Sequence, residues 1–94
     1  MIYRNKWVDV ADAELLEAVD WYNNRRNGLG IDLAECVDAA METLNRHPFI
    51  GTPVSNSVRR ILIRRFPYGI FYRIDEDLIE IVGFRHFRQR PLEL

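Results

Sequence analysis

The sequence has 94 residues, of which 48% are hydrophobic and 29% charged, and its formal net charge is −1. This length fits one domain with a single modest core, and the composition is typical of a globular protein. No apolar run reaches the ~20 residues of a membrane-spanning helix, and residues 1–10 lack the apolar block of a signal peptide. We therefore predict one domain over residues 1–94, located in the cytoplasm.

The charges are distributed unevenly along the chain. Residues 1–47 carry five Lys/Arg and nine Asp/Glu, whereas residues 48–94 carry eight Arg and five Asp/Glu. Every basic residue except Lys6 is arginine, which suits bidentate contacts with carboxylate or phosphate but exchanges protons poorly because it stays charged. A basic half of this kind indicates docking of an acidic partner, either protein or nucleic acid.

The first half has the pattern of one strand followed by two helices. Residues 2–8 alternate as a strand does, and Asp9 is placed to cap the helix that follows. Apolar residues at helical spacing predict helices over residues 10–26 and 31–46. The segment "NGLG", residues 27–30, is expected to end the first helix, because glycine tolerates the left-handed conformation of a C-cap.

The second half has the pattern of a loop followed by a meander. Residues 48–57 contain two prolines and a glycine, which favours turns. Residues 58–66, 70–75 and 78–86 have strand patterns separated by the short segments "FPYG" and "DED". The predicted fold is α+β, in the order β-α-α-β-β-β, with a helical hairpin packed on one face of a small antiparallel sheet.

The sequence contains no motif for a cofactor or a metal. It has no glycine-rich phosphate loop, no Cys/His metal spacing and no serine elbow. The single cysteine, Cys36, falls within the second helical pattern and is predicted to be a buried small hydrophobic residue. Direct DNA binding by this chain alone is not expected, because its first half is acidic and no helix is rich in Arg or Lys.

The element order and several segments resemble the RelE/ParE superfamily of toxins from bacterial type II toxin–antitoxin modules. The matching segments are "AELLEAVDWYNNR" with "GLG", "HPFIGTPV", the arginine-rich strand leading into "FPYGIFYRID", and "IEIVGFRHFRQRP". The "FPY…YRI" hairpin, followed by a strand that ends in histidine with a proline five residues later, is most similar to the ParE branch.

This resemblance implies one of two activities. RelE-like members cleave messenger RNA in the ribosomal A site without metal, whereas ParE-like members are associated with inhibition of DNA gyrase. Members of both branches are neutralised by an antitoxin whose helical and extended C-terminal segment wraps the toxin. We therefore expect a ParD-like antitoxin with an acidic C-terminal segment as partner, in a hetero-oligomer, gyrase as target, and no association with membranes.

The nuclease alternative requires a group that accepts the 2′-OH proton, cations for the phosphorane, and an acid for the leaving oxygen. In this chain its site would be formed by Arg64, Arg85, His86 and Arg88. Nuclease members place a tyrosine near the chain end or after the terminal-strand histidine, or lysines on the middle strand. Here Phe87 follows His86 and no lysine follows Lys6. We therefore favour a toxin that binds its target, and a third interpretation is a non-toxic family member retained as a binding module.

The predicted partner-binding residues are arginines of the second half together with one tryptophan of the first helix. They are Arg59, Arg60, Arg64, Arg65, Arg73, Trp21, Arg88 and Arg90. Trp21 lies off the apolar stripe of its helix, so an exposed edge is expected there, whereas Trp7 and Phe49 are expected to pack in the core or a loop. In the alternative interpretation the arginines form a solvated face that prevents the sheet edge from pairing with another chain. His86 is then a strand-end histidine with a structural hydrogen bond.

Overall fold

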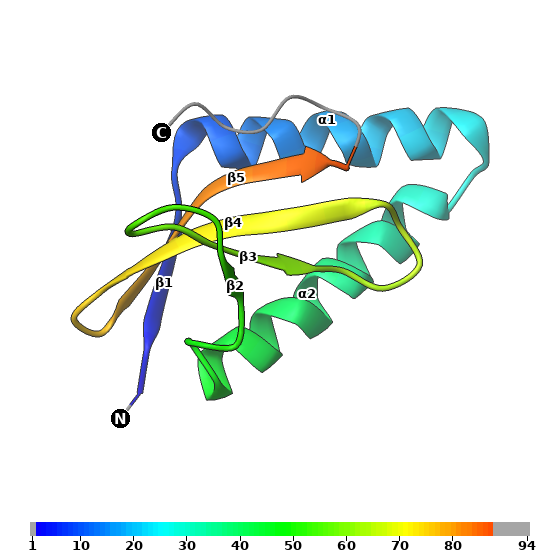
Figure 1. The fold of residues 1–94 in the computed structure, drawn as a ribbon. Helices are drawn as coiled ribbons and strands as arrows, with labels where there is room; N and C mark the ends of the chain where they lie inside the picture. The colour runs from blue at the N-terminus through cyan, green and yellow to red at the C-terminus, as the bar shows by residue number, and fades with distance from the viewer. Residues whose placement is uncertain (1, 88–94) are drawn as a thin grey trace.

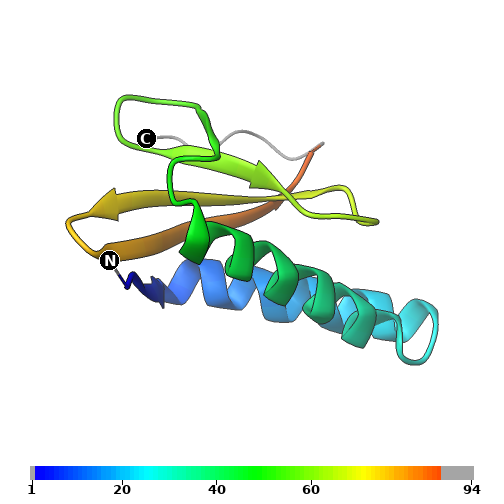
Figure 2. The ribbon, with the colours of Figure 1, turned by 90° about the horizontal axis from the view of Figure 1, so that it is seen from below.

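The computed structural model describes residues 2–87, and within them the chain forms two helices and a five-stranded sheet (Figure 1). The elements are β1 (Arg4–Trp7), α1 (Asp9–Arg25), α2 (Leu29–Arg46), β2 (Thr52–Pro53), β3 (Arg59–Leu62), β4 (Tyr68–Asp75) and β5 (Leu78–His86). Both helices lie on the same side of the sheet (Figure 2). The predicted α+β fold and its element order are confirmed.

The sheet is mixed rather than antiparallel throughout, with strand order β1-β5-β4-β3-β2. The β3–β4–β5 meander is antiparallel as predicted, but β1 runs parallel to β5, with Arg4 opposite Leu78 and Trp7 opposite Ile81. Alternation along a strand is the same for both directions, so the pattern of residues 2–8 carries no information about this pairing. The two-residue strand β2 lies within the segment that was predicted to be a loop.

Three element ends differ from the predicted ones. Val8 is the N-cap of α1, so the prediction that Asp9 caps this helix was wrong. Gly28 has the expected positive φ, 87°, but it precedes α2 rather than closing α1. β3 ends at Leu62, so Arg64 and Arg65 lie in the β3–β4 turn instead of on the strand. Neither described helix is long and apolar enough to cross a membrane.

The core lies between the helices and the sheet face that they cover. Its fully buried members with the largest side chains are Tyr72, Phe84, Leu33, Leu44, Ile70, Ile79 and Ile81. Trp7 packs against this core as predicted, and Cys36 is only half-buried at its margin. Phe49 is exposed, with the Arg59 guanidinium 5.3 Å from its ring centroid.

Tyr72 connects the middle of the sheet to the segment between α2 and β2. Its buried hydroxyl donates to the Pro48 carbonyl at 2.8 Å and accepts from the Gly51 N–H at 2.9 Å. Gly51 has to be glycine, because a Cβ there would collide with the Tyr72 ring. Burial raises the pKa of Tyr72, and the Gly51 N–H and the Arg59 guanidinium offset part of this rise. This anchor fixes the loop that leads into β2 and β3.

Candidate partner-binding surface

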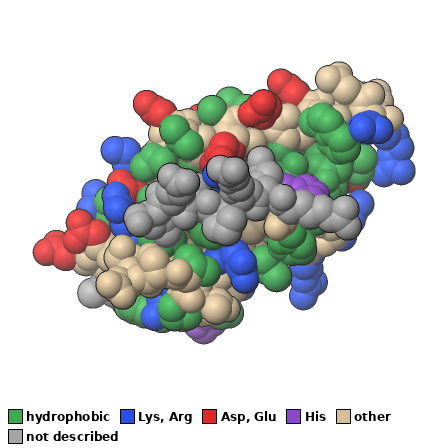
Figure 3. All heavy atoms as spheres, turned by 45° about the horizontal axis from the view of Figure 1, so that its top comes forward, with side chains coloured by type: hydrophobic (Ala, Val, Ile, Leu, Met, Phe, Trp, Pro, Cys, Tyr) green, Lys and Arg blue, Asp and Glu red, His purple; other side chains and the backbone are tan. Residues whose placement is uncertain are grey.

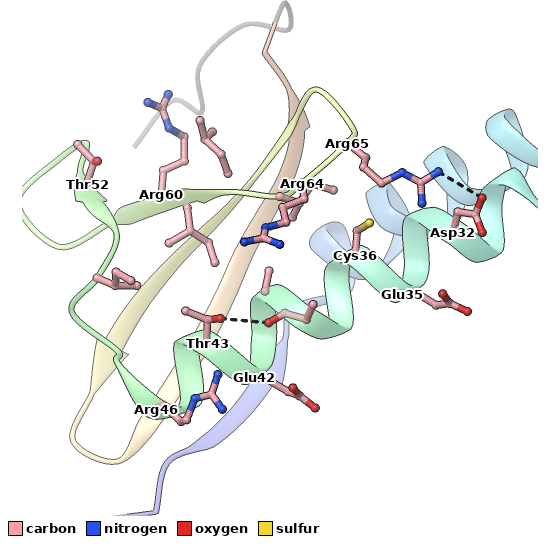
Figure 4. A pocket seen from close by; sticks show the side chains of 16 residues that line it. Asp32, Glu35, Cys36, Glu42, Thr43, Arg46, Thr52, Arg60, Arg64 and Arg65 are labelled. Atoms are coloured by element: carbon pink, nitrogen blue, oxygen red, sulfur yellow. Dashed lines mark hydrogen bonds and ion pairs between the residues drawn. The ribbon is translucent and has the colours of Figure 1, made fainter.

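A groove of about 690 Å³ runs between α2 and β3 (Figure 4). Apolar residues of both walls form its floor, among them Ala40 of α2, Ile61 of β3 and Ile63 just after β3. We call it the arginine groove after the basic residues that line it, which are Arg46, Arg60, Arg64 and Arg65. Its α2 wall also carries acidic residues, which are Asp32, Glu35 and Glu42. The two walls therefore differ in charge, because the β3 side is basic and the α2 side is largely acidic.

The groove exposes apolar surface beside an incomplete sheet edge. β2 pairs only with Arg59 and Arg60, so within the described residues no strand accompanies the outer edge of β3 beyond them. Ile50 and Leu62, which line the groove, are 56% and 54% exposed. Exposed apolar side chains surrounded by charged ones are typical of a surface that contacts another protein.

Arg60 and Arg64 have guanidinium groups that make no hydrogen bond or ion pair with any described residue. The stem of Arg60 lies across Gly69 of β4, since a Cβ at Gly69 would be 3.1 Å from Arg60 Cδ. Figure 4 shows the Arg60 head pointing away from α2 and the Arg64 side chain pointing from the β3–β4 turn toward the groove. As far as residues 2–87 are concerned, both charges are therefore available to an external anion.

Arg73 and Arg65 of the predicted set have acidic partners inside the chain. Arg73 Nε donates to Glu80 Oε1 at 2.6 Å, across the β4–β5 pair. Arg65 Nη2 lies 3.5 Å from Asp32 Oδ2, a long contact between two side chains that are 58% and 37% exposed. A long, exposed ion pair contributes little to the free energy of folding. Arg65 can therefore exchange Asp32 for another carboxylate with little loss of stability.

Arg59 has a structural contact with the backbone. Its Nη1 donates to the carbonyls of Phe49 and Gly51, at 3.0 and 2.8 Å. This guanidinium therefore helps Tyr72 to hold the loop before β2. Arg88 and Arg90, the remaining arginines of the predicted surface, lie outside the described residues.

Trp21 is half-exposed, as expected from its position off the helix stripe. The Arg25 guanidinium carbon lies 4.3 Å from its ring centroid, and the Trp21 and Tyr22 rings meet in a T-shaped arrangement, 4.9 Å between centroids. Trp21 lines a second cleft instead of the arginine groove. Of the predicted partner-binding residues, Arg60, Arg64 and Arg65 thus line the arginine groove and Trp21 the second cleft. Arg59 and Arg73 line neither.

The candidate nuclease residues are not gathered in one place. Arg64 lines the arginine groove, whereas His86 lines the second cleft with its ring 5.2 Å from that of Tyr68. Arg85 precedes His86 on β5, so the two side chains leave opposite faces of the strand. The Arg85 side chain is 22% exposed, and its Nε lies 3.5 Å from Glu14 Oε2. Arg88 lies outside the described residues.

Sequence reasoning missed the role of Glu14. β1 ends opposite Ile81, and farther along β5 the backbone N–H of Phe84 donates to Glu14 Oε1 at 3.1 Å. The carboxylate of Glu14 thus accepts the backbone hydrogen bond that a neighbouring strand would accept at this position. It also lies near Arg85. The 70-residue separation between Glu14 and Phe84 leaves no local sequence signal for this contact. Within residues 2–87, no group of three His, Cys, Asp or Glu residues is arranged to hold a metal ion.

Comparison with known proteins identifies the family. The family model of the ParE toxin of the type II toxin–antitoxin system, parDE, matches residues 6–91. A solved structure described as the chromosomal ParDE TA system from P. aeruginosa has a TM-score of 0.79 at 18% identity, covering 90% of this chain and 96% of that one. No curated protein matches the sequence significantly. The structural likeness supports the fold and the family model spans nearly the whole chain, so this chain belongs to the ParE toxin family of type II toxin–antitoxin systems.

Proposed function

We propose that this chain is a toxin that acts by binding, that an acidic antitoxin segment neutralises it at the arginine groove, and that DNA gyrase is its target. The observation that carries this proposal is the pair of guanidinium groups of Arg60 and Arg64, which have no acidic partner among the described residues and lie beside exposed apolar surface. Membership of the ParE family supports an antitoxin partner, since the similar P. aeruginosa structure is described as a ParDE system.

The charges of the groove restrict how an acidic segment would lie in it. Carboxylates placed near Arg60 and Arg64 gain charge-assisted hydrogen bonds, and apolar side chains can cover Ile50 and Leu62. The carboxylates of the α2 wall repel an acidic peptide, so the segment should follow β3 and its turn instead of α2. Such a segment would leave Arg59 in its contact with the loop carbonyls.

A supercoiling assay with purified gyrase tests the proposed target. The purified chain should inhibit supercoiling in proportion to its molar ratio to gyrase, as expected of a binding inhibitor without turnover. The cognate antitoxin should restore supercoiling when added in equimolar amount. Full supercoiling in the presence of a large molar excess of folded toxin would contradict the proposal.

The nuclease alternative predicts a different product. Primer extension on translated messenger RNA would then reveal cuts in the ribosomal A site that disappear in His86→Gln and Arg85→Lys variants, which keep hydrogen-bonding capacity at these positions. We expect growth arrest without such cuts. Expression without growth arrest would instead favour a non-toxic binding module.

A further inference from the structure

A second cleft, of about 430 Å³, opens between α1 and the adjoining ends of β4 and β5. Its lining consists of Glu14, Glu17, Ala18, Trp21, Tyr22, Tyr68, Phe84 and His86. We call it the aromatic cleft. It shares no lining residue with the arginine groove, so it is a separate surface that the proposed toxin function does not use. Its size falls in the range of about 300–1,000 Å³ that is typical of ligand clefts.

The aromatic walls are braced by contacts with one another. Tyr68 stacks on Phe84 with centroids 4.8 Å apart and an interplanar angle of 10°. The rings of His86 and Tyr22 meet Tyr68 edge-on, at 5.2 and 6.2 Å between centroids. Because Phe84 belongs to the buried core, this wall is anchored and a ligand need not order it.

Two carboxylates give the aromatic cleft a negative charge. Glu14 is tied to the Phe84 N–H and Arg85, whereas Glu17 makes no hydrogen bond or ion pair with any described residue. Burial raises the pKa of the Tyr68 phenol, with further contributions from Tyr22 and Glu17. Glu17 is itself exposed and has no ion pair within residues 2–87, so the cleft presents an accessible negative charge beside a partly buried aromatic wall. Such a charge attracts a cation.

Trp21 already has one guanidinium on its ring, that of Arg25, which does not line the cleft. The Arg25 guanidinium carbon lies 4.3 Å from the Trp21 ring centroid, a distance at which cations are attracted to an aromatic face. The other cationic or titratable groups near the cleft are Arg85, held by Glu14, and His86, held against Tyr68. Among residues 2–87, the charge of Glu17 is therefore left for a ligand.

We propose that the aromatic cleft binds an arginine side chain of a partner protein, with the guanidinium against the aromatic wall and paired with Glu17. Arginine fits better than lysine because its planar head is weakly hydrated and stacks on aromatic rings. This site is complementary in charge to the arginine groove, so a partner that engages both surfaces presents acidic residues to one and a basic residue to the other. The proposal does not depend on the identity of the toxin's target.

An NMR titration of the ¹⁵N-labelled chain with Nα-acetyl-arginine amide tests the site. We expect saturable shifts of the Trp21 indole N–H and of the Phe84 amide, and no saturable shift with the neutral isostere Nα-acetyl-citrulline amide. Glu17→Gln should weaken binding about fivefold or more, because it removes the paired charge. Asp38→Asn removes the same charge from an exposed position on α2 and should leave the affinity unchanged.

Three results of this titration would overturn the proposal. They are equal binding of the citrulline derivative, tighter binding of Nα-acetyl-lysine amide, and an unchanged affinity in Glu17→Gln. A further measurement uses a variant carrying both Arg88→Ala and Arg90→Ala, which should bind Nα-acetyl-arginine amide as the parent does. Markedly tighter binding by this variant would also contradict the proposal, because the chain's own arginines would then be the occupants.

Discussion

At the scale of single residues, arginines with the same side chain differ in whether their guanidinium groups are available to a binding partner. Arg73 is paired with Glu80 and Arg59 with two carbonyls, whereas Arg60 and Arg64 have no such contact with described residues. The sequence predicts a basic surface, because the charges are visible in it. It does not predict which guanidinium groups stay open, because the acceptors of the paired ones are brought to them only by folding. Arg65 and Asp32, for example, are 33 residues apart.

Tyr72→Phe should destabilise the fold by about 1–3 kcal/mol, because it leaves the buried Gly51 N–H and Pro48 carbonyl without their partner. Tyr68→Phe is the matched control, since the Tyr68 hydroxyl makes no hydrogen bond with a described residue and its loss should cost about 0.5 kcal/mol or less. Urea unfolding of both variants measures the difference. Equal stabilities would show that the Tyr72 anchor contributes nothing.

The tyrosines also predict how stability depends on pH. Burial raises the pKa of both Tyr68 and Tyr72 above the ordinary 10.0, so the folded state keeps the phenol protons longer than the unfolded state. Their contribution is constant below pH 10 and is lost as the pH rises beyond it, because the unfolded chain then binds fewer protons. The urea concentration at the unfolding midpoint should therefore decrease as the pH is raised above 10. This decrease per pH unit should be smaller in Tyr72→Phe than in the parent. Identical decreases in the two proteins would contradict this assignment.

At the scale of elements, the helical hairpin depends on a close approach at Gly30. The Gly30 N–H donates to Asn23 Oδ1 at 2.7 Å, which joins the start of α2 to α1. A Cβ at this position would collide with the Val19 carbonyl and lie 2.7 Å from Asn23 Cγ. The "NGLG" segment predicts the break between the helices, but it does not show that its two glycines serve different purposes.

Gly30→Ala should destabilise the protein by about 1–3 kcal/mol, because the Val19 backbone cannot move aside and this cost exceeds the ~1 kcal/mol gain in helix propensity. Gly28→Asn is the comparison, since Gly28 has φ 87° with open space around it and asparagine tolerates this conformation. In thermal unfolding, the melting temperature of Gly30→Ala should be well below that of Gly28→Asn. The opposite order would show that helix contact does not limit this position.

The elements themselves were largely predictable. The range predicted for the last strand, 78–86, agrees with β5, because its alternation is uninterrupted between two clear turns. β3 was predicted too long, since "LIRRF" continues an apolar–charged pattern although Arg65 takes a φ of 69° in a turn. The parallel pairing of β1 and the aromatic cleft were not predictable, because both require contacts between opposite ends of the chain.

At the scale of the whole molecule, the uneven charge of the sequence corresponds to two surfaces, the acidic aromatic cleft and the basic arginine groove. Figure 3 shows acidic side chains along the upper edge, where α1 lies, while the arginine groove lies between α2 and β3. A partner with both an acidic segment and a suitably placed arginine is complementary to both. Because surface charges are screened by salt, the affinity for such a partner should fall as ionic strength rises.

We expect the open arginines of the groove, Arg60 and Arg64, to hold another macromolecule. Calorimetric titration with the cognate antitoxin is the measurement that tests this claim. A variant with both Arg60→Ala and Arg64→Ala should bind about 100-fold more weakly or worse, because each lost charge-assisted contact costs about 1.5–3 kcal/mol. Arg26→Ala, which removes an exposed arginine outside both surfaces, should bind as the parent does. An affinity of the folded double variant within about threefold of the parent value, less than 1 kcal/mol, would contradict the claim.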